Sequence, residues 1–355
     1  MILLGACHQA PPAVHPAPDS SNTFFKDLPY GTDAQFNPWS VIANHGFDQL
    51  RTSPRTDITH YPFGSSFKSV LRSAIEPDRS IRNYGYRNWL RNEVFPLTLR
   101  SQGGGQWYPN YTLHLFGDGI TYVRLIDWYE QHGVASHPEI AAGATTYAFH
   151  LVVEAIENGP GADKGVDALT DLLIFDSGSI LLWNQSWMRR LFSGPVEVND
   201  WLGQVSVGIP GRTIENAYSM VMVRTPIPGA TDWKFMITHG YMFTLGLSRR
   251  IGTGDWLTLG LGADAPVNPV IDTVTGKKSA TLESNGGVFY DRNGSLLASL
   301  VTRGGSNNGV TLNLYPGVVR VGAFRPSFWL QQNRGGGYRF GISSSLGVGL
   351  STYAR

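Results

Sequence analysis

Two stretches near the C-terminal end of the chain alternate between large apolar residues and small or polar ones. From residue 233 to 248 every second position is large and apolar except His239, and the positions between are mostly Gly, Thr and Met. The alternation returns from Tyr338 to Leu350, where only Ser344 interrupts the large residues. A period of two predicts β-strands with two unlike faces. We expect the large face to meet lipid or a core.

Turn residues divide the rest of this region into further candidate strands. Gly, Pro and Asn signals separate candidates at residues 201–209, 217–225, 233–248, 255–263, 280–290, 295–302, 310–315, 318–329 and 338–353. Tight connections predict antiparallel neighbours, and most candidates approach the 9–11 residues of a tilted membrane strand. This pattern is typical of a transmembrane β-barrel. Because nine strands is an odd number, we expect one more within residues 106–115.

The preceding region is expected to be helical. Candidate helices cover residues 112–132, 138–158 and 163–192, the last broken near Ser177 and Gly178, and they are apolar around much of their circumference, which predicts burial. The small face of the strands would let such helices approach closely. The predicted fold class is therefore α+β, an N-terminal helical region followed by an antiparallel up-and-down transmembrane β-barrel that the helices plug or cap. The expected parts are residues 1–22, 23–106, 107–195 and 201–355.

Charge limits the classes of partner. Charged residues make up 15% of the chain, against about 25% in ordinary soluble domains. The net charge is +1 and the basic residues between 72 and 100 are interleaved with acids, so we expect no nucleic-acid partner. These arginines suit anionic lipid head groups or a salt-bridged solvated face; they are Arg72, Arg79, Arg82, Arg87, Arg91 and Arg100.

Cys7, the single cysteine of the chain, ends the sequence Leu4-Gly5-Ala6-Cys7. This sequence resembles the lipobox of bacterial lipoproteins, and residues 9–22, rich in Pro and Ala, predict a flexible tether. Few residues precede this lipobox-like sequence, so most of a signal peptide is missing. A start codon assigned too far downstream would account for the missing residues. The resemblance implies a lipid anchor at Cys7, and His8 in place of Asp implies the bacterial outer membrane. The chain thus resembles, at the level of class, an outer-membrane lipoprotein with a C-terminal β-barrel.

No strong catalytic motif is present, neither GxSxG, a P-loop nor HExxH. The helical region does place His114 four residues before Asp118 and His150 four residues before Glu154, so each pair shares a helix face. The candidate catalytic residues are His114, Asp118, His150, Glu154 and Asp171. Asp127, Glu130 and Asp176 are further acids in apolar surroundings.

Three interpretations of these residues are open. They form a buried hydrogen-bond network, bind a metal through imidazole and carboxylate, or act in acid–base catalysis on an ester with Ser177 or Ser179 as nucleophile. The network is the simplest, so no metal or cofactor is assigned. An accessible cavity at the cluster would favour an enzyme, and a closed one a structural role.

The leading function is accordingly an envelope structural or assembly protein that binds other envelope components. Its expected partners are the lipid bilayer, other envelope proteins and lipopolysaccharide. An envelope hydrolase or lipid-modifying enzyme is the alternative, so the sequence leaves open whether the protein is an enzyme. A channel or transporter is the weakest of the three.

Overall fold

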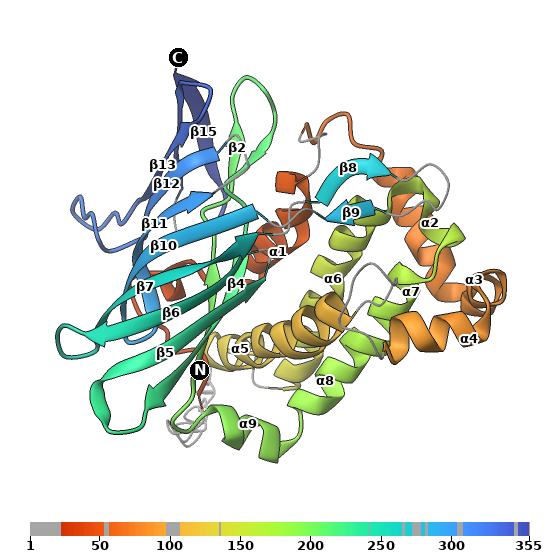
Figure 1. Cartoon of the computed structure of the whole chain (residues 1–355), viewed down its shortest axis with the longest axis horizontal. Helices are drawn as coiled ribbons and strands as arrows, with labels where there is room; N and C mark the ends of the chain where they lie inside the picture. The colour runs from red at the N-terminus through yellow and green to blue at the C-terminus, as the bar shows by residue number, and fades with distance from the viewer. Residues whose placement is uncertain are drawn as a thin grey trace, which may run out of the picture.

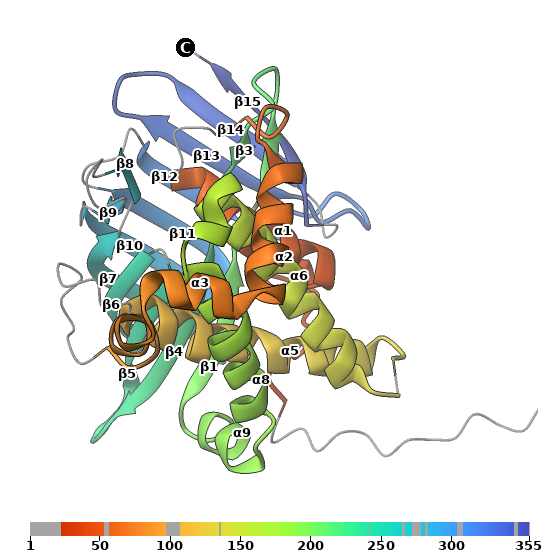
Figure 2. The ribbon, with the colours of Figure 1, turned by 90° about the vertical axis from the view of Figure 1, so that its right-hand side faces the viewer.

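The computed structural model describes residues 23–52, 57–96, 107–134, 136–240, 242–264, 267–271, 278–280, 283–303, 308–343 and 347–354. Cys7 and the expected tether lie outside these residues. In the described part, a layer of helices packs against one face of a curved β-sheet (Figure 1). Figure 2 looks onto the helices, with the sheet behind them.

The helical layer combines α-helices with shorter 3-10 and π-helical segments. The α-helices are α1 (Pro38–Thr52), α2 (Phe63–Ile75), α3 (Pro77–Tyr84), α4 (Tyr86–Trp89), α5 (Asp118–Gln131), α6 (Pro138–Asn158), α7 (Asp167–Thr170), α8 (Ser177–Trp183) and α9 (Ser186–Phe192). The 3-10 segments are η2 (Asp33–Gln35) and η6 (Gly159–Lys164), and the π-helical segments are η3 (Leu90–Val94), η5 (Tyr108–Gly117) and η7 (Asp171–Asp176). Among the described residues, no helix is both long and apolar enough to cross a membrane.

Local signals account for the helix that the sequence predicts best. α6 has the predicted bounds, residues 138–158. Pro138 stands at its first position and Gly159 follows its end with φ of 61°, the residues that favour a helix start and stop. Two other predictions are wrong. The chain does not break at Ser177, because η7 runs directly into α8, and residues 107–115 are helical instead of forming an extra strand.

The main sheet has thirteen strands in the order β1-β4-β5-β6-β7-β10-β11-β12-β13-β14-β15-β2-β3. Neighbours are antiparallel except β15 and β2, which are parallel. Its strands are β1 (Glu197–Leu202), β2 (Ser206–Gly208), β3 (Ile214–Glu215), β4 (Ser219–Ile227), β5 (Ala230–Gly240), β6 (Met242–Arg250), β7 (Asp255–Asp264), β10 (Glu283–Arg292), β11 (Ser295–Arg303), β12 (Asn308–Leu314), β13 (Ser327–Asn333), β14 (Tyr338–Ser343) and β15 (Gly349–Ala354). A separate pair, β8 (Val267–Ile271) and β9 (Lys278–Ala280), forms a two-stranded sheet.

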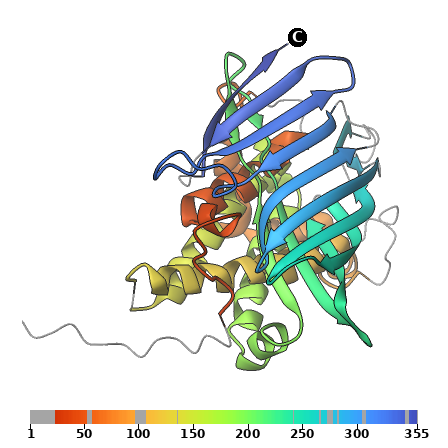
Figure 3. The same ribbon diagram turned by 90° about the vertical axis from the view of Figure 1, so that its left-hand side faces the viewer.

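The predicted closed barrel is wrong, because the sheet remains open with β1 and β3 at its edges. Helices occupy the place where closing strands would pair: β1 contacts α1 and α5, and β3 contacts α1. The helices therefore cover one face and the edges of an open sheet instead of plugging a closed barrel. Figure 3 shows the opposite side, where the strands face the viewer and the helices lie behind them.

The alternation correctly predicted the two faces of the sheet. Residues 233–240 and 242–248 lie in two strands, β5 and β6, instead of the single strand expected, and their register keeps the alternation because Ile237 pairs with Leu245 and Phe235 with Leu247. The large side chains of these pairs point outward and are exposed, whereas Phe243 is half-buried. The small and polar side chains point to the helical layer and are buried, among them Thr238, Thr244, Ser248, Thr258, Ser299, Ser327 and Ser343.

An N-terminal segment fills the space between the small face and α5. The Gln35 amide donates to the Ser327 hydroxyl (2.9 Å), which ties η2 to β13. Asp33 pairs with Arg124 of α5 at 3.1 Å, and both side chains are fully buried. The segment therefore joins the sheet to the helix that carries Asp118.

Candidate functional site

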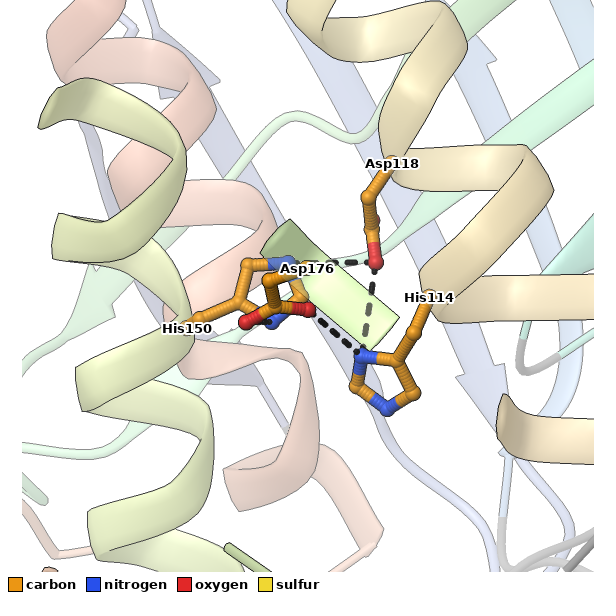
Figure 4. A group of neighbouring side chains, drawn as sticks. All are labelled: His114, Asp118, His150 and Asp176. Atoms are coloured by element: carbon orange, nitrogen blue, oxygen red, sulfur yellow. Dashed lines mark ion pairs between the residues drawn. The ribbon is translucent and has the colours of Figure 1, made fainter. Parts of the chain in front are cut away.

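The structure brings all five candidate residues into one buried cluster between three helical parts of the chain. His114 lies in η5 and Asp118 begins α5, so these two sit on one continuous helix. His150 and Glu154 come from α6, and Asp171 from η7. Asp176, at the end of η7, lies between His114 and His150 (Figure 4). The convergence that the sequence suggested holds in space, whereas a catalytic role for these residues remains a prediction.

Each imidazole of the cluster lies between carboxylates. Asp118 Oδ2 is 3.1 Å from His150 Nε2 and 3.5 Å from His114 Nδ1. Asp176 Oδ1 is 3.4 Å from His114 Nδ1, and its Oδ2 is 2.9 Å from His150 Nδ1. On the other side of the His114 ring, Nε2 is 3.7 Å from Asp171 Oδ2. The arrangement joins η5, α5, α6 and η7 through their charged groups.

Burial makes the charges of this cluster depend on one another. Burial alone would lower the pKa of His114 and His150, but Asp176 and Asp118 outweigh it and raise both pKa values to about 10. Burial and the charges of Asp171 and Asp167 raise the pKa of Glu154 well above its usual value. Burial and neighbouring acids likewise raise the pKa of Asp171, whereas the imidazoles of His150 and His114 lower the pKa of Asp176.

The cluster is largely closed from the surface, although the His114 and Asp118 side chains are 12% and 13% exposed. Glu154 and Asp176 are fully buried and the His150 side chain is 2% exposed. One surface hollow is lined by Phe25 and Pro316 and another lies along α2, and neither includes a cluster residue. This burial favours a structural role over a site that substrates enter.

Local backbone features position the cluster. His114 lies in one π-helical segment and Asp171 and Asp176 in another, and such segments recur at functional sites. Gly119 lets α8 approach α5, because a Cβ there would lie 1.9 Å from the Trp183 ring. The close approach of these helices holds Asp176 beside Asp118.

A second histidine–acid arrangement adjoins the cluster and was missed by the sequence reasoning. The Ser219 hydroxyl is 3.2 Å from His45 Nδ1, and His45 Nε2 is 2.9 Å from Asp200 Oδ2. Thr121 donates to the same Asp200 oxygen at 2.8 Å. His45 also lies 4.0 Å from Asp118 Oδ1, which links the two groups. These residues come from α1, β1, β4 and α5, so no spacing in the sequence could have joined them.

The proposed nucleophiles of the cluster are engaged elsewhere or buried. The Ser177 hydroxyl is 2.6 Å from that of Tyr147 and donates to the Leu172 carbonyl at 3.3 Å. Ser179 is buried. Ester hydrolysis at His114 or His150 therefore has no support from these two serines.

The basic region is mainly a salt-bridged surface in its described part. Arg72 and Arg79 pair with Glu76, and Arg82 pairs with Asp78, all on exposed helices. Arg100 lies outside the described residues. Contact between these arginines and anionic lipid remains a prediction.

The chain matches no protein-family model, no curated protein and no solved structure. Its function is therefore inferred from the geometry described above.

Proposed function

We propose that this protein is a structural protein of the bacterial envelope that lies against membrane lipid with the outer face of its sheet. In this arrangement the outer face of the sheet contacts the membrane. The helical layer, on the other side of the sheet, binds other envelope components. The envelope setting rests on the lipobox-like sequence before Cys7. The lipid contact rests on one structural observation, a continuous apolar band.

The band is a row of large apolar side chains in direct cross-strand register. Each is between 36% and 66% exposed. The band consists of Phe235, Leu247, Leu259, Val288, Leu300, Leu312, Leu330 and Phe340, which lie in this order across β5, β6, β7, β10, β11, β12, β13 and β14. Apolar patches of this extent mark contact with a membrane or another protein.

Neighbouring rows widen the band. Exposed Ile237, Leu245 and Leu261 continue it along β5, β6 and β7. At its border the Arg249 guanidinium lies 5.7 Å from the centre of the exposed Trp233 ring. Trp beside Arg suits the boundary between hydrocarbon and head groups.

Strand length and edge protection agree with lipid as the occupant. β5, β6, β7, β10 and β11 have 11, 9, 10, 10 and 9 residues, close to what a tilted membrane strand needs, whereas β12, β13 and β14, which carry the rest of the band, have 7, 7 and 6. Lipid cannot satisfy unpaired backbone groups. Helices lie beside both edge strands, α1 and α5 next to β1 and α1 next to β3.

Flotation with liposomes of phosphatidylethanolamine and phosphatidylglycerol tests the lipid contact. In a Cys7→Ala background, which removes the proposed lipid anchor, we expect the otherwise wild-type protein to float with the vesicles and Leu259→Arg to shift strongly toward the unbound fraction, because a lipid-facing Arg costs about 2–4 kcal/mol near mid-bilayer. Ile140→Arg is the matched control, since Ile140 on α6 is also 66% exposed but lies off the sheet. Equal behaviour of the two variants, or a wild-type protein that stays unbound as a dimer, would contradict the proposal.

Mass spectrometry of the native N-terminus tests the envelope anchor separately. We expect a lipidated Cys7 as the first residue. A chain that begins with an unmodified Met1 would remove the lipoprotein part while leaving the sheet's lipid contact to the flotation result.

Hydrolysis at Ser219 is a second candidate function, favoured by the order hydroxyl, imidazole, carboxylate in Ser219, His45 and Asp200. A fluorophosphonate probe should then label the wild-type protein but not Ser219→Ala, with Ser177→Ala as the control that still reacts. Absence of labelling in the wild-type protein would discard this candidate.

A further inference from the structure

Four side chains of the buried cluster lie within contact distance without forming hydrogen bonds to one another. Among the described residues, His114 Nδ1, both ring nitrogens of His150 and both carboxylate oxygens of Asp176 are buried and have no hydrogen-bond partner. Yet Asp176 and Asp118 oxygens lie 2.9–3.5 Å from these nitrogens. The groups are close but not aligned as donor and acceptor, which is unusual for buried polar atoms.

We propose that His114 Nδ1, His150 Nε2, Asp118 Oδ2 and Asp176 Oδ1 bind a divalent transition-metal ion, with Zn²⁺ preferred. One such atom from each of the four residues lies within 4.8 Å of the others. Ligands about 2.0–2.1 Å from a tetrahedral zinc are about 3.3–3.4 Å apart. Three of the ligand-to-ligand distances here are 3.1, 3.4 and 3.5 Å. The side chains are thus spaced for an ion at their centre (Figure 4).

Three of the proposed ligand side chains also direct the nitrogen or oxygen that does not bind the ion toward another side chain, as ligands of known metal centres do. His150 Nδ1 faces Asp176 Oδ2 at 2.9 Å, and His114 Nε2 faces Asp171 Oδ2 at 3.7 Å. Asp118 Oδ1 lies 4.0 Å from His45 Nδ1. Carboxylates behind metal-bound imidazoles fix the ring orientation and raise the basicity of the ligand. Asp171 and His45 are therefore positioning residues for the centre.

The donor set selects the class of metal and the role. Imidazole nitrogen suits zinc and other transition metals, whereas magnesium and calcium prefer oxygen alone. Two carboxylates would neutralise the charge of a divalent ion, which a buried site requires. Four protein ligands in a closed site are typical of structural zinc, whereas catalytic zinc keeps an open position. The ion would tie η5 and α5 to α6 and η7, a role separate from the lipid contact of the sheet.

Metal analysis and cobalt substitution of the full-length wild-type protein test the centre without any variant. After incubation with Zn²⁺ and gel filtration, we expect about one zinc per chain by mass spectrometry of the metal. Titration of the metal-free protein with Co²⁺ should produce the visible absorption of tetrahedral cobalt and saturate at one equivalent. A protein that retains no zinc and gives no such spectrum overturns the proposal.

Matched variants assign the ligands. His150→Gln and Asp176→Asn should abolish the cobalt spectrum, and Asp171→Asn should weaken Zn²⁺ binding by about 10–100-fold as loss of an orienting partner does. Asp127→Asn is the control, because Asp127 on α5 is also buried but belongs to neither group of metal-ligating side chains at the cluster. Circular dichroism checks the fold of each variant. A spectrum retained by folded His150→Gln, or lost in Asp127→Asn but kept in Asp118→Asn, would show that the proposed ligands are wrong.

Discussion

Replacing Asp176 by Asn should remove a pH-dependent part of the protein's stability when chelator keeps the cluster metal-free. In the folded protein the pKa of His114 and that of His150 rise from 6.5 to about 10 through their carboxylate neighbours, against the effect of burial. A histidine whose pKa rises on folding stabilises the fold fully below its unfolded pKa. That contribution is lost as the pH rises from 6.5 through 10.

The size of this stability loss follows from the rise in the histidine pKa values on folding. At about 1.4 kcal/mol for each pH unit, the rise from 6.5 to about 10 corresponds to about 5 kcal/mol for one imidazole. Both imidazoles face the same Asp176, so we assign about 5 kcal/mol to the two histidines together and not to each. This energy is close to the about 3–5 kcal/mol that breaking a buried ion pair costs. The free energy of unfolding should therefore fall by several kcal/mol in total as the pH rises from 7 to 10.

Urea unfolding followed by Trp fluorescence, in detergent and EDTA from pH 6.5 to 10, measures this dependence. Asp176→Asn should be several kcal/mol less stable than the wild-type protein near pH 6.5, and the difference should narrow toward pH 10. His137→Gln is the control, because the His137 side chain is 72% exposed and should leave the slope unchanged. Equal slopes in wild type and Asp176→Asn, or a wild-type stability that is constant over this range, would refute the buried ion pairs.

Three further outcomes are expected. With Zn²⁺ in place of EDTA, the fall in wild-type stability with pH should disappear above the unfolded histidine pKa of 6.5, because the metal-bound and the unfolded imidazoles both lack the proton there; an unchanged slope would argue against the metal centre. Gly119→Ala should lower the free energy of unfolding by about 1–3 kcal/mol, because the added Cβ would collide with Trp183. Gly143→Ala is the control: its Cβ would have its nearest neighbour at 3.7 Å, so thermal unfolding should show an unchanged or higher stability. Arg124→Met should lower the free energy of unfolding by about 3–5 kcal/mol, because Asp33 would stay buried without its cation. In denaturant titrations, adding Asp33→Leu to this variant should restore part of the lost stability. A double variant no more stable than Arg124→Met would show that the unpaired Asp33 charge is not the cause.

Sequence signals correctly predicted a helix where the residues next to its two ends define its start and stop. Pro138 and Gly159 define both ends of α6 without help from the rest of the chain. The same locality explains the failure at Ser177. A Ser-Gly pair weakens a helix, but contacts made by η7 and α8 with η5 and α5 keep the chain helical through it.

The candidate site was predictable only in part. The four-residue spacing correctly put His114 beside Asp118, whereas the acid expected beside His150, Glu154, groups with His114 and Asp171. Asp176 is one acid among several in the sequence, and only the packing of η7 against α6 makes it the partner of His150. Ser219, His45 and Asp200 come from distant parts of the chain, so their contact required the fold.

The sequence by itself determined that the C-terminal half forms strands with a large apolar face and a small polar face, because side-chain direction in a strand depends only on whether a position is odd or even. It did not determine closure. Whether a sheet closes depends on which strands meet at its edges, and here β15 pairs with β2 while α1 and α5 cover β1 and β3. Tertiary structure alone therefore decided that the sheet is open, that helices cover its small face, and that two histidines and two aspartates meet at one buried point.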